Sequence, residues 1–238
     1  DILIALNEKR ERISVLNDYD SYLQKLEQQL AKKEKELAQI SDEVSEIRQR
    51  SAVKLVSEIK SALNDLNFFD VQFDMQFDRL PDYTANGIDA PEFLISTNPG
   101  EPLKPLGKVA SGGELSRIML GIKTIMAEND HIESLIFDEI DSGISGRTAQ
   151  MVSEKMNELG RNHQIICITH LPQIAAMADA HFLIEKAVEN KSTVSRIRRL
   201  SDNDSVAELA RMLGGAKITD TVMESAREMK ALAMEKKI

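Results

Sequence analysis

Two carboxylates and one imidazole follow short apolar runs in the second half of the chain. Asp138 and Glu139 come directly after the run 134–137, and His170 follows the run that ends at Ile168. If both runs are neighbouring parallel strands, these side chains share the sheet edge at which ligands bind. Such a group suits hydrolysis of a phosphate bond. One carboxylate serves a Mg²⁺ shell, the other orients the attacking water, and the imidazole bonds the terminal phosphate.

A turn of small residues opens the helix that apolar spacing predicts over 113–128. Ser111, Gly112 and Gly113 precede Glu114. Two glycines let the backbone approach a ligand closely and aim free N–H groups at an anion, and a carboxylate in the first turn complements the positive helix end. The simpler interpretation is an ordinary helix start with Ser111 as N-cap, and for this turn taken alone we favour it.

Each of these features has an ordinary structural explanation. An Asp-Glu pair after an apolar run is commonly the start of a loop, and a Thr-His pair is commonly a cap. His131, His163 and His181 also lie near apolar runs, and we assign them no role. The combination of the three features, in this order and spacing, is what favours a phosphate site.

The composition limits the possible classes of protein. The 238 residues allow one large domain or a smaller domain with an extension. A net charge of −9 argues against a generally basic, nucleic-acid-binding surface, although a local patch remains open. The single cysteine, Cys167, lies in the apolar run 165–168, which predicts a buried thiol and suits a reducing compartment. No apolar run approaches a membrane span and no signal peptide is visible. Because the first residue is Asp1, we expect an excised fragment or a processed product.

Residues 1–66 differ in kind from the rest of the chain. From Leu23 the apolar residues alternate at spacings of three and four, which is typical of a coiled coil, with Lys33 in the one missing position. The earlier apolar residues do not continue this register, so we expect a break or bend near 17–20. Residues 1–60 include twelve acidic and eleven basic side chains, which indicates a solvated face. The partner helix is either another copy or a segment outside this chain. The seam comprises Leu23, Leu26, Leu30, Leu37, Ile40, Val44 and Ile47.

The remaining elements are predicted from alternation, apolar runs and turn residues. A strand over 134–137, a helix over 147–160 and a strand over 164–168 form a β-α-β unit with parallel strands. The others are strands at 71–77 and 93–96, loops at 81–91 (with a turn at Asn86-Gly87) and 98–105, a short helix at 171–178, a strand pair at 181–184 and 193–200, and helices at 206–213 and 219–235.

The wording of these motifs resembles a known class of ATPase. The turn 111–114, the acidic pair 138–139, the turn 142–146 and Thr169-His170 resemble the second half of an ABC-type ATPase head. Within that superfamily VASGGELSRIMLGIKTI, STNPGEPLKPL, FDEIDSGISG and ELARMLGG look like the bacterial DNA repair family RecN, an SMC-like branch. The resemblance extends from about Leu16 to the end of the chain. The condensin and Rad50-like branches carry differently worded signatures and D-loops.

The resemblance implies roles for individual residues around the nucleotide. Asp138 matches the Walker B aspartate of the Mg²⁺ shell, Glu139 the catalytic glutamate, and His170 the switch histidine. The signature motif, which caps the γ-phosphate of ATP held by the opposite head, is matched by Ser111, Gly112, Gly113 and Glu114.

The D-loop of the family, which crosses the dimer interface, is matched by Ser142, Gly143, Ile144 and Ser145. Ser145 stands where many relatives have aspartate, and this departure puts D-loop coupling through a carboxylate in doubt.

One element of the ATPase head has no match. The chain contains no Gly-x-x-x-x-Gly-Lys-Ser/Thr, and Gly107-Lys108-Val109 lacks both the spacing and the hydroxyl residue. In the family that loop lies in an N-terminal lobe beyond a long coiled coil. We therefore expect an α/β fold at 67–238, the C-terminal lobe of an ABC/SMC-type head with a P-loop NTPase-like parallel sheet and flanking helices. An α-helical coiled-coil arm segment precedes it at 1–66. Alone, this chain should hydrolyse little or no ATP.

The resemblance also implies cofactors, partners and a cellular place. These are ATP and Mg²⁺, the protein's own N-terminal head lobe, a homodimer formed through ATP-bridged heads, and DNA. The role is double-strand break repair and recombination, in the cytoplasm at the nucleoid and without a membrane. The alternatives are a non-catalytic coiled-coil module that bridges DNA, and a cohesin, condensin or Rad50-type head lobe. The intact set of Asp138, Glu139 and His170 favours the enzyme.

Contact with DNA follows from the resemblance and not from the composition. Solvated edge-strand charges, which discourage aggregation, are our preferred interpretation of the densest basic cluster. That cluster consists of Lys186, Lys191, Arg196, Arg198 and Arg199.

Overall fold

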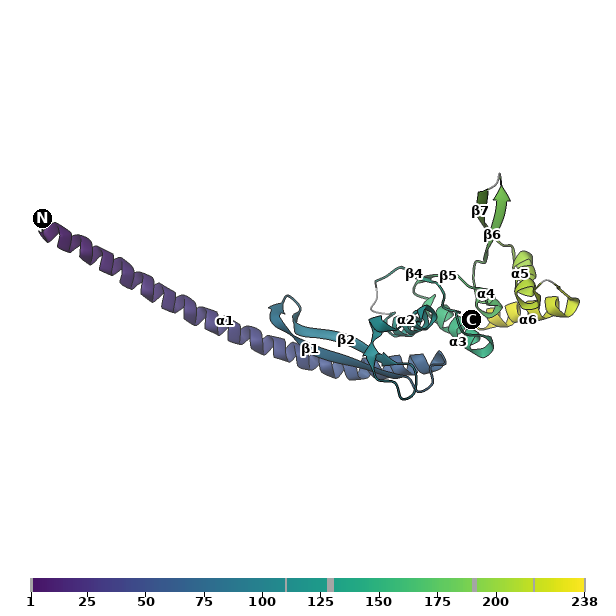
Figure 1. Cartoon of the computed structure of the whole chain (residues 1–238), viewed down its shortest axis with the longest axis horizontal. Helices are drawn as coiled ribbons and strands as arrows, with labels where there is room; N and C mark the ends of the chain where they lie inside the picture. Colours follow the sequence, from purple (N-terminus) through teal and green to yellow (C-terminus); the bar gives the residue numbers. More distant parts are fainter. Residues whose placement is uncertain (1, 110, 128–130, 190–191, 216, 238) are drawn as a thin grey trace. The chain divides into compact units, whose positions relative to one another are not determined.

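The computed structural model describes residues 2–109, 111–127, 131–189, 192–215 and 217–237 (Figure 1). The chain forms two compact units, Asp1–Lys54 with Phe77–Pro91, and Leu55–Gln76 with Glu92–Ile238. Its helices and strands are α1 (Ile2–Asp65), β1 (Gln72–Thr84), β2 (Gly87–Ser96), β3 (Lys104–Pro105), the 3₁₀ helix η1 (Leu106–Lys108), α2 (Gly112–Met126), β4 (Ser134–Phe137), α3 (Gly146–Leu159), β5 (Gln164–Cys167), α4 (Pro172–Ala176), β6 (Phe182–Glu189), β7 (Ser192–Arg199), α5 (Asp202–Gly214) and α6 (Asp220–Glu235).

Helix α1 is continuous from Ile2 to Asp65, including residues 17–20, where we expected a break. The chain has no proline or glycine before Pro81, and residues such as Asn and Asp weaken a helix by only a fraction of a kcal/mol each. At 17–20 the spacing of the apolar residues changes, but the helix itself continues. Of the seam residues from Leu23 to Ile47, Val44 is half-buried and the leucines and isoleucines are exposed. Their pairing with another helix stays a prediction. Among the described residues, no helix is both long and apolar enough to cross a membrane.

In the first unit, α1 is joined to the β1–β2 hairpin by a buried aspartate. Asp89 accepts hydrogen bonds from Ser45 Oγ at 2.7 Å and from Arg48 Nη1 at 2.9 Å. These two donors hold the pKa of Asp89 below its ordinary value despite its burial, and the Ser45 hydroxyl has the larger effect. A second bond runs from Arg48 Nη2 to the carbonyl oxygen of Asn86 at 2.7 Å. The hairpin tip is therefore fixed to this part of α1.

The predicted loop over 81–91 is wrong, because Pro81 lies inside β1 and Pro91 inside β2. Proline lacks the N–H that a central strand needs, but it is tolerated where one side of a strand has no neighbour. The predicted turn is confirmed, since residues 85–86 form it and Gly87 has φ +95°.

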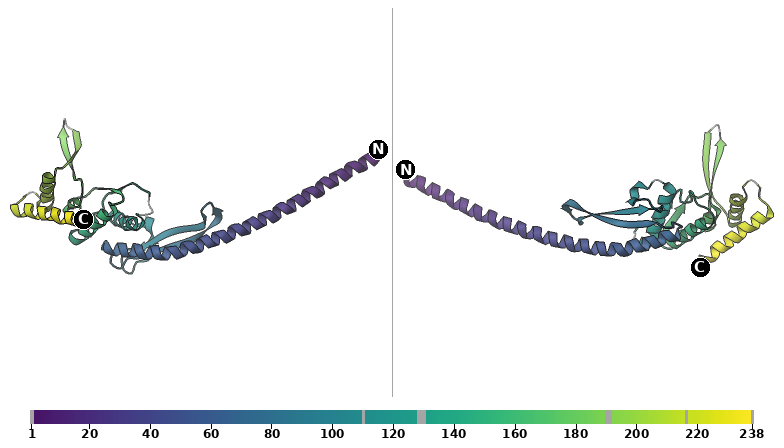
Figure 2. Two further views of the ribbon diagram at one scale, coloured as in Figure 1. Left: turned by 180° about the vertical axis from the view of Figure 1, so that it is seen from behind. Right: turned by 60° about the horizontal axis from the view of Figure 1, so that its bottom comes forward.

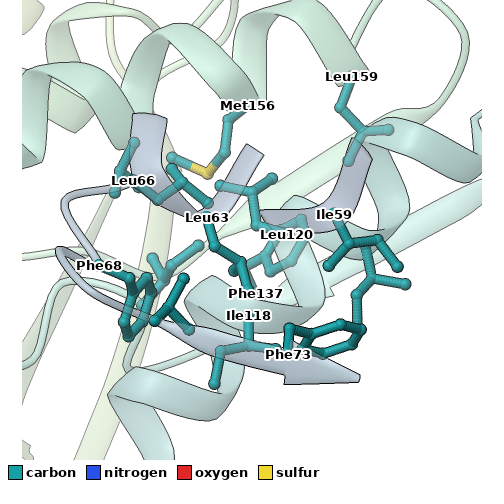
Figure 3. Close-up of a cluster of buried hydrophobic side chains, with 14 of the residues drawn as sticks. Ile59, Leu63, Leu66, Phe68, Phe73, Ile118, Leu120, Phe137, Met156 and Leu159 are labelled. Atoms are coloured by element: carbon teal, nitrogen blue, oxygen red, sulfur yellow. The ribbon is translucent and has the colours of Figure 1, made fainter. Parts of the chain in front are cut away.

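The core of the second unit gathers residues from along the whole sequence interval 59–174 (Figure 3). Helix α2 approaches the end of α1 closely, because a Cβ on Gly121 would lie 3.1 Å from Leu63 Cδ2. The labelled members are Ile59, Leu63, Leu66, Phe68, Phe73, Ile118, Leu120, Phe137, Met156 and Leu159, and all are buried.

Strands β4 and β5 pair in parallel, as predicted, with Phe137 opposite Cys167. One face of the pair packs on the core, where Phe137 is buried and Cys167 is half-buried. The other face is exposed in this chain, since Ile136 is 69% and Ile166 46% exposed. Cys167, which we expected to be buried, is thus covered by the core in part. One apolar layer covers the pair on one side only.

A second, smaller apolar cluster joins α4, α5 and α6. The antiparallel hairpin β6–β7 stands apart from these helices in every view (Figures 1 and 2). Two apolar side chains of β6 are open to solvent, with Phe182 54% and Ile184 55% exposed. The predicted fold class, α/β with a parallel strand pair, flanking helices and an N-terminal helical segment, is confirmed.

Candidate phosphate site at the ends of β4 and β5

The small-residue turn forms the N-terminus of α2, as predicted. Ser111 is the N-cap, and its Oγ accepts a hydrogen bond from the backbone N–H of Glu114 at 3.4 Å. Its carbonyl oxygen accepts from the N–H of Leu115 at 3.0 Å. The capping interpretation is thus confirmed. Ala110, which belongs to the same motif, lies outside the described residues.

Both glycines of this turn are in contact with the loop that follows β4. A Cβ on Gly112 would lie 2.6 Å from Glu139 Oε2. A Cβ on Gly113 would lie 2.8 Å from Ser142 Cβ and 2.9 Å from the Ser142 carbonyl oxygen. Real side chains do not occupy such distances. Gly113 is therefore required for α2 to begin against the backbone of the loop 138–145, whereas Gly112 leaves room for the end of the flexible Glu139 side chain.

The acidic pair lies at the carboxyl end of β4, and both side chains are exposed. Asp138 Oδ1 accepts a hydrogen bond from the N–H of Glu139 at 2.9 Å. Ser116 Oγ on α2 donates to the carbonyl oxygen of Asp138 at 2.9 Å. Glu139 has φ +55°, a conformation that non-glycine residues adopt at a cost and that is common at functional sites. The pair is accessible and held by its own backbone.

A buried arginine fixes the loop after the acidic pair. Arg117 Nη1 donates to the carbonyl oxygens of Ile140 at 3.2 Å and Ser142 at 2.9 Å. Its guanidinium carbon lies 5.5 Å from the centre of the Phe68 ring, a cation–π distance. Burial lowers the pKa of Arg117 from its ordinary value, and the charge of Glu114 acts in the opposite direction. The loop is therefore bound to the same helix that carries the glycine turn.

The end of β5 is joined to this loop by Asp141. Its Oδ2 accepts hydrogen bonds from Thr169 Oγ1 at 2.6 Å and from the backbone N–H of His170 at 2.8 Å. His170 Nδ1 lies 3.0 Å from the same oxygen. The Asp141 side chain is 5% exposed and that of His170 is 73% exposed. A buried carboxylate thus holds an exposed imidazole at the sheet edge.

The predicted site residues therefore lie in one region of the second unit. The glycine turn contacts Glu139 and Ser142, and His170 is joined to the same loop through Asp141. Of the predicted D-loop residues, Ser142 N–H donates to the Glu139 carbonyl oxygen at 2.9 Å. Gly143 has φ +74°, and Ser145 caps α3 through its backbone position without a side-chain hydrogen bond.

Sequence reasoning missed Asp141 and Arg117 as members of this site. Asp141 was hidden in the run 138–141, where two other acids already had roles. Arg117 resembles an ordinary surface charge three residues after Glu114. A signal for it existed, because Gly113, Arg117 and Gly121 recur every four residues and lie on one buried helix face.

The carboxylates of the loop after β4 affect the cysteine of β5. Burial, followed by the nearby carboxylates of Asp141 and Asp138, raises the pKa of the Cys167 thiol to about 12. The thiol is therefore neutral at physiological pH and unsuited to nucleophilic chemistry.

A magnesium ion fits this donor set only in part. Among the described residues, no group of three or more His, Cys, Asp or Glu side chains is arranged to hold a metal ion. A single exposed carboxylate such as Asp138 is nevertheless a usual protein contribution to Mg²⁺, which keeps waters and takes phosphate oxygens as its other ligands.

His163 and His181 have local partners. His163 is buried with Nδ1 2.6 Å from the Ile132 carbonyl oxygen, and His181 Nδ1 lies 3.0 Å from Ser205 Oγ. In the basic cluster, Arg198 lies 3.7 Å from Glu185 on the exposed β6–β7 hairpin. Lys191 lies outside the described residues.

Comparison with known proteins decides the family. No protein-family model matches the chain. The DNA repair protein RecN of Bacillus subtilis is 42% identical over 244 residues, a match that covers 96% of this chain and 42% of that protein. RecN of Vibrio cholerae is 40% identical over 76% of this chain and 33% of that protein. The chain belongs to the RecN family.

The RecN-family chain spans less than half the length of these relatives, 42% of the Bacillus protein and 33% of the Vibrio protein. Among solved structures, the Smc head domain with a coiled coil and joint from Pyrococcus yayanosii is 21% identical with a TM-score of 0.49. That match covers 68% of this chain and 29% of the other. The family assignment rests on the sequence relatives.

Proposed function

We propose that residues 67–238 are the C-terminal lobe of a RecN-type ATPase head, and that 1–66 are part of its coiled-coil arm. In this proposal two complete heads engage through ATP during DNA double-strand break repair and recombination. Asp138 serves the Mg²⁺ shell, Glu139 and His170 act in hydrolysis, and the turn 111–114 caps ATP held by the opposite head. The names of the relatives support the repair role.

The observation that carries the proposal is the junction of three motifs at one sheet edge. Gly112 and Gly113 contact the loop after β4, and that loop is hydrogen-bonded to the residues after β5. Ligands of parallel sheets bind outside this edge. Motifs that are 27 to 59 residues apart in the sequence therefore meet where a nucleotide would bind.

The chain's own residues would divide the chemistry as follows. Glu139, exposed beside Asp138, accepts a proton from a water molecule and directs that water at the terminal phosphate. Magnesium, when bound, neutralises charge on the phosphate oxygens. The helix N-terminus at Gly112 and Gly113 donates backbone N–H groups to an anion, as helix N-termini commonly do. His170 offers its exposed ring to the same phosphate.

The exposed face of the β4–β5 pair supports a missing partner layer. Ile136, Ile166 and Ile168 are 69%, 46% and 50% exposed, and parallel strands normally have both faces covered. We propose that the N-terminal head lobe, which would supply the phosphate-binding loop absent from this sequence, covers this face. The isolated chain then lacks the main ATP-binding loop and is inactive.

The finer parts of the proposal follow the family resemblance. They are a homodimer through ATP-bridged heads, contact with DNA, and a cytoplasmic, nucleoid-associated location. Because the formal net charge is −9, contact with DNA would have to be made by a local basic patch.

A reconstitution experiment tests the proposal. ATP turnover is measured for the chain alone, for the chain mixed with a separately made N-terminal lobe, and for the same mixture carrying Glu139→Gln. We expect turnover only in the unmutated mixture, with a loss of at least about a hundredfold in the Glu139→Gln mixture, because an amide cannot accept the proton. Ser111→Arg, which places a bulky cation at the turn, should abolish ATP-dependent dimerisation.

Other results would change the assignment. Turnover by the chain alone would mean that the nucleotide site lies elsewhere. A folded mixture without turnover would favour the non-catalytic DNA-bridging module.

A further inference from the structure

Asp141 is a buried acid at the edge where the proposed chemistry takes place. Its side chain is 5% exposed, and one of its oxygens, Oδ2, meets Thr169 Oγ1, the His170 N–H and His170 Nδ1 at 2.6, 2.8 and 3.0 Å. Two of these three contacts come from one residue. The carboxylate therefore fixes both the backbone and the ring of His170.

The carboxylate is itself held in place on both sides. Arg117 donates to the carbonyl oxygens of Ile140 and Ser142, the two neighbours of Asp141. Because Arg117 belongs to α2, the position of Asp141 depends on the helix that begins at the glycine turn. Asp141 is a fixed acceptor and not a mobile surface acid.

The contact with Nδ1 decides which ring nitrogen is available to a ligand. A carboxylate oxygen can only accept, so its position 3.0 Å from Nδ1 favours a proton on Nδ1, and Nε2 on the opposite side of the ring remains for another partner. The ring is 73% exposed, so such a partner has access. A free imidazole has no such preference for one orientation.

We propose that Asp141 is a positioning residue of the ATPase. It holds the His170 imidazole by Nδ1 so that Nε2 faces the terminal phosphate of the nucleotide. This inference rests on the proposed function for the identity of the ligand, and on the observed contacts for the orientation of the ring. It also joins the glycine turn, through Arg117 and Asp141, to His170 in the same chain. Through that connection, the turn that would cap one nucleotide is linked to the imidazole that would face another.

The first arm of the test needs no ATPase activity. The ¹⁵N shifts of the His170 ring are measured by NMR in the chain, in Asp141→Asn, in Thr169→Val and in Asp179→Asn. We expect the Nδ1-protonated form in the chain, and a population shift toward the Nε2-protonated form in Asp141→Asn, since a neutral amide oxygen is a weaker acceptor than a carboxylate. Thr169→Val removes a different donor to the same oxygen and should leave the ring state unchanged. Asp179, whose side chain is 93% exposed, provides the matched control.

The second arm measures turnover in the reconstituted mixture of the two lobes. Asp141→Asn should lower kcat about tenfold or more with a change in KM for ATP of less than about threefold, because misplacement of a reacting group acts mainly on the chemical step. In a His170→Ala background the same substitution should have no further effect on kcat, as expected for two residues that act as one unit. Asp179→Asn should leave both constants within about twofold of the unmutated mixture.

The outcomes separate this inference from the proposed function. An equal loss of kcat with and without His170, or an Asp141→Asn ring in the same state as the unmutated ring, overturns the positioning role even when the mixture hydrolyses ATP. If the mixture is inactive, the proposed function fails, and the ring state in the first arm still decides whether Asp141 orients His170. Thermal unfolding of each variant identifies a loss caused by misfolding, and the NMR arm then decides on the variants that remain folded.

Discussion

The second unit contains two small sheets that differ in what supports them. The parallel pair β4–β5 packs one face on α2, α3 and the end of α1, and its strands end in loops joined by Asp141 and Arg117. The antiparallel hairpin β6–β7 stands apart, with Phe182, Ile184 and Ile197 at least half exposed. Both sheets are thus held by pairing between two strands, but only β4–β5 also packs on a hydrophobic core. A site that must hold side chains to a fraction of an ångström needs that core.

Phenylalanine truncation in the two sheets should show the largest contrast. Phe137 on β4 is 6% exposed and Phe182 on β6 is 54% exposed. Phe137→Ala should lower the free energy of unfolding by about 3–5 kcal/mol, because it removes a buried ring and leaves a cavity. Phe182→Ala should cost less than about 1 kcal/mol. Urea unfolding of the chain measures both. Similar losses for the two variants would mean that the hairpin has a core of its own.

Arginine truncation should give the next largest contrast. Arg117→Ala leaves the carbonyl oxygens of Ile140 and Ser142 without their donor, at an expected cost of about 2–4 kcal/mol. Arg198→Ala removes an exposed 3.7 Å ion pair with Glu185 and should cost about 0–1 kcal/mol. Hydrogen exchange at the N–H of Ser142 checks the mechanism, since loosening of the loop should expose it. Unchanged protection in Arg117→Ala would contradict the role of this arginine.

The reactivity of a cysteine thiol should also distinguish the two sheets. The pKa of Cys167 is raised to about 12, so between pH 9 and 12 its thiolate is favoured only in the unfolded chain. The contribution of this thiol to stability is therefore present below about pH 9 and is lost as the pH rises toward 12. At pH 9 iodoacetamide should alkylate Cys167 at least about tenfold more slowly in the folded than in the urea-unfolded chain. An engineered cysteine on the hairpin, Ser195→Cys in a Cys167→Ser background, should react at nearly the same rate in both states.

Local patterns predicted the elements of the embedded region well. β4, β5 and α2 follow from short apolar runs and a helix start, and no observed bound differs from the predicted one by more than two residues. The same patterns failed at Pro81, which lies on the edge strand β1, and at Pro91, which lies in β2 before the part that pairs with β3. The proposed chemical residues were named from sequence because their motifs are contiguous.

The residues that hold those motifs were not predictable in the same way. Asp141 and Arg117 act through contacts with residues that are 23 to 29 positions away in the sequence. Neither contact can be inferred before the loop path is known. The exposed outer face of β4–β5 was missed for a related reason, because an apolar run does not reveal how many layers cover it.

The consequence of inserting a residue into helix α1 depends on where along the helix the residue is added. Near its end, Ile59 and Leu63 are fully buried against Phe73 and α2. Each residue added to a helix turns everything beyond it by about 100°, so a single insertion between Ile59 and Leu63 would rotate one of these two side chains out of the core. The stretch before Lys33 has only exposed apolar side chains, and there an added residue changes the phase of the seam without displacing a buried group. A change in the number of helical turns is therefore tolerated before Lys33, whereas the bonds of Asp89 fix the turn that carries Ser45 and Arg48, and the core fixes the last three turns.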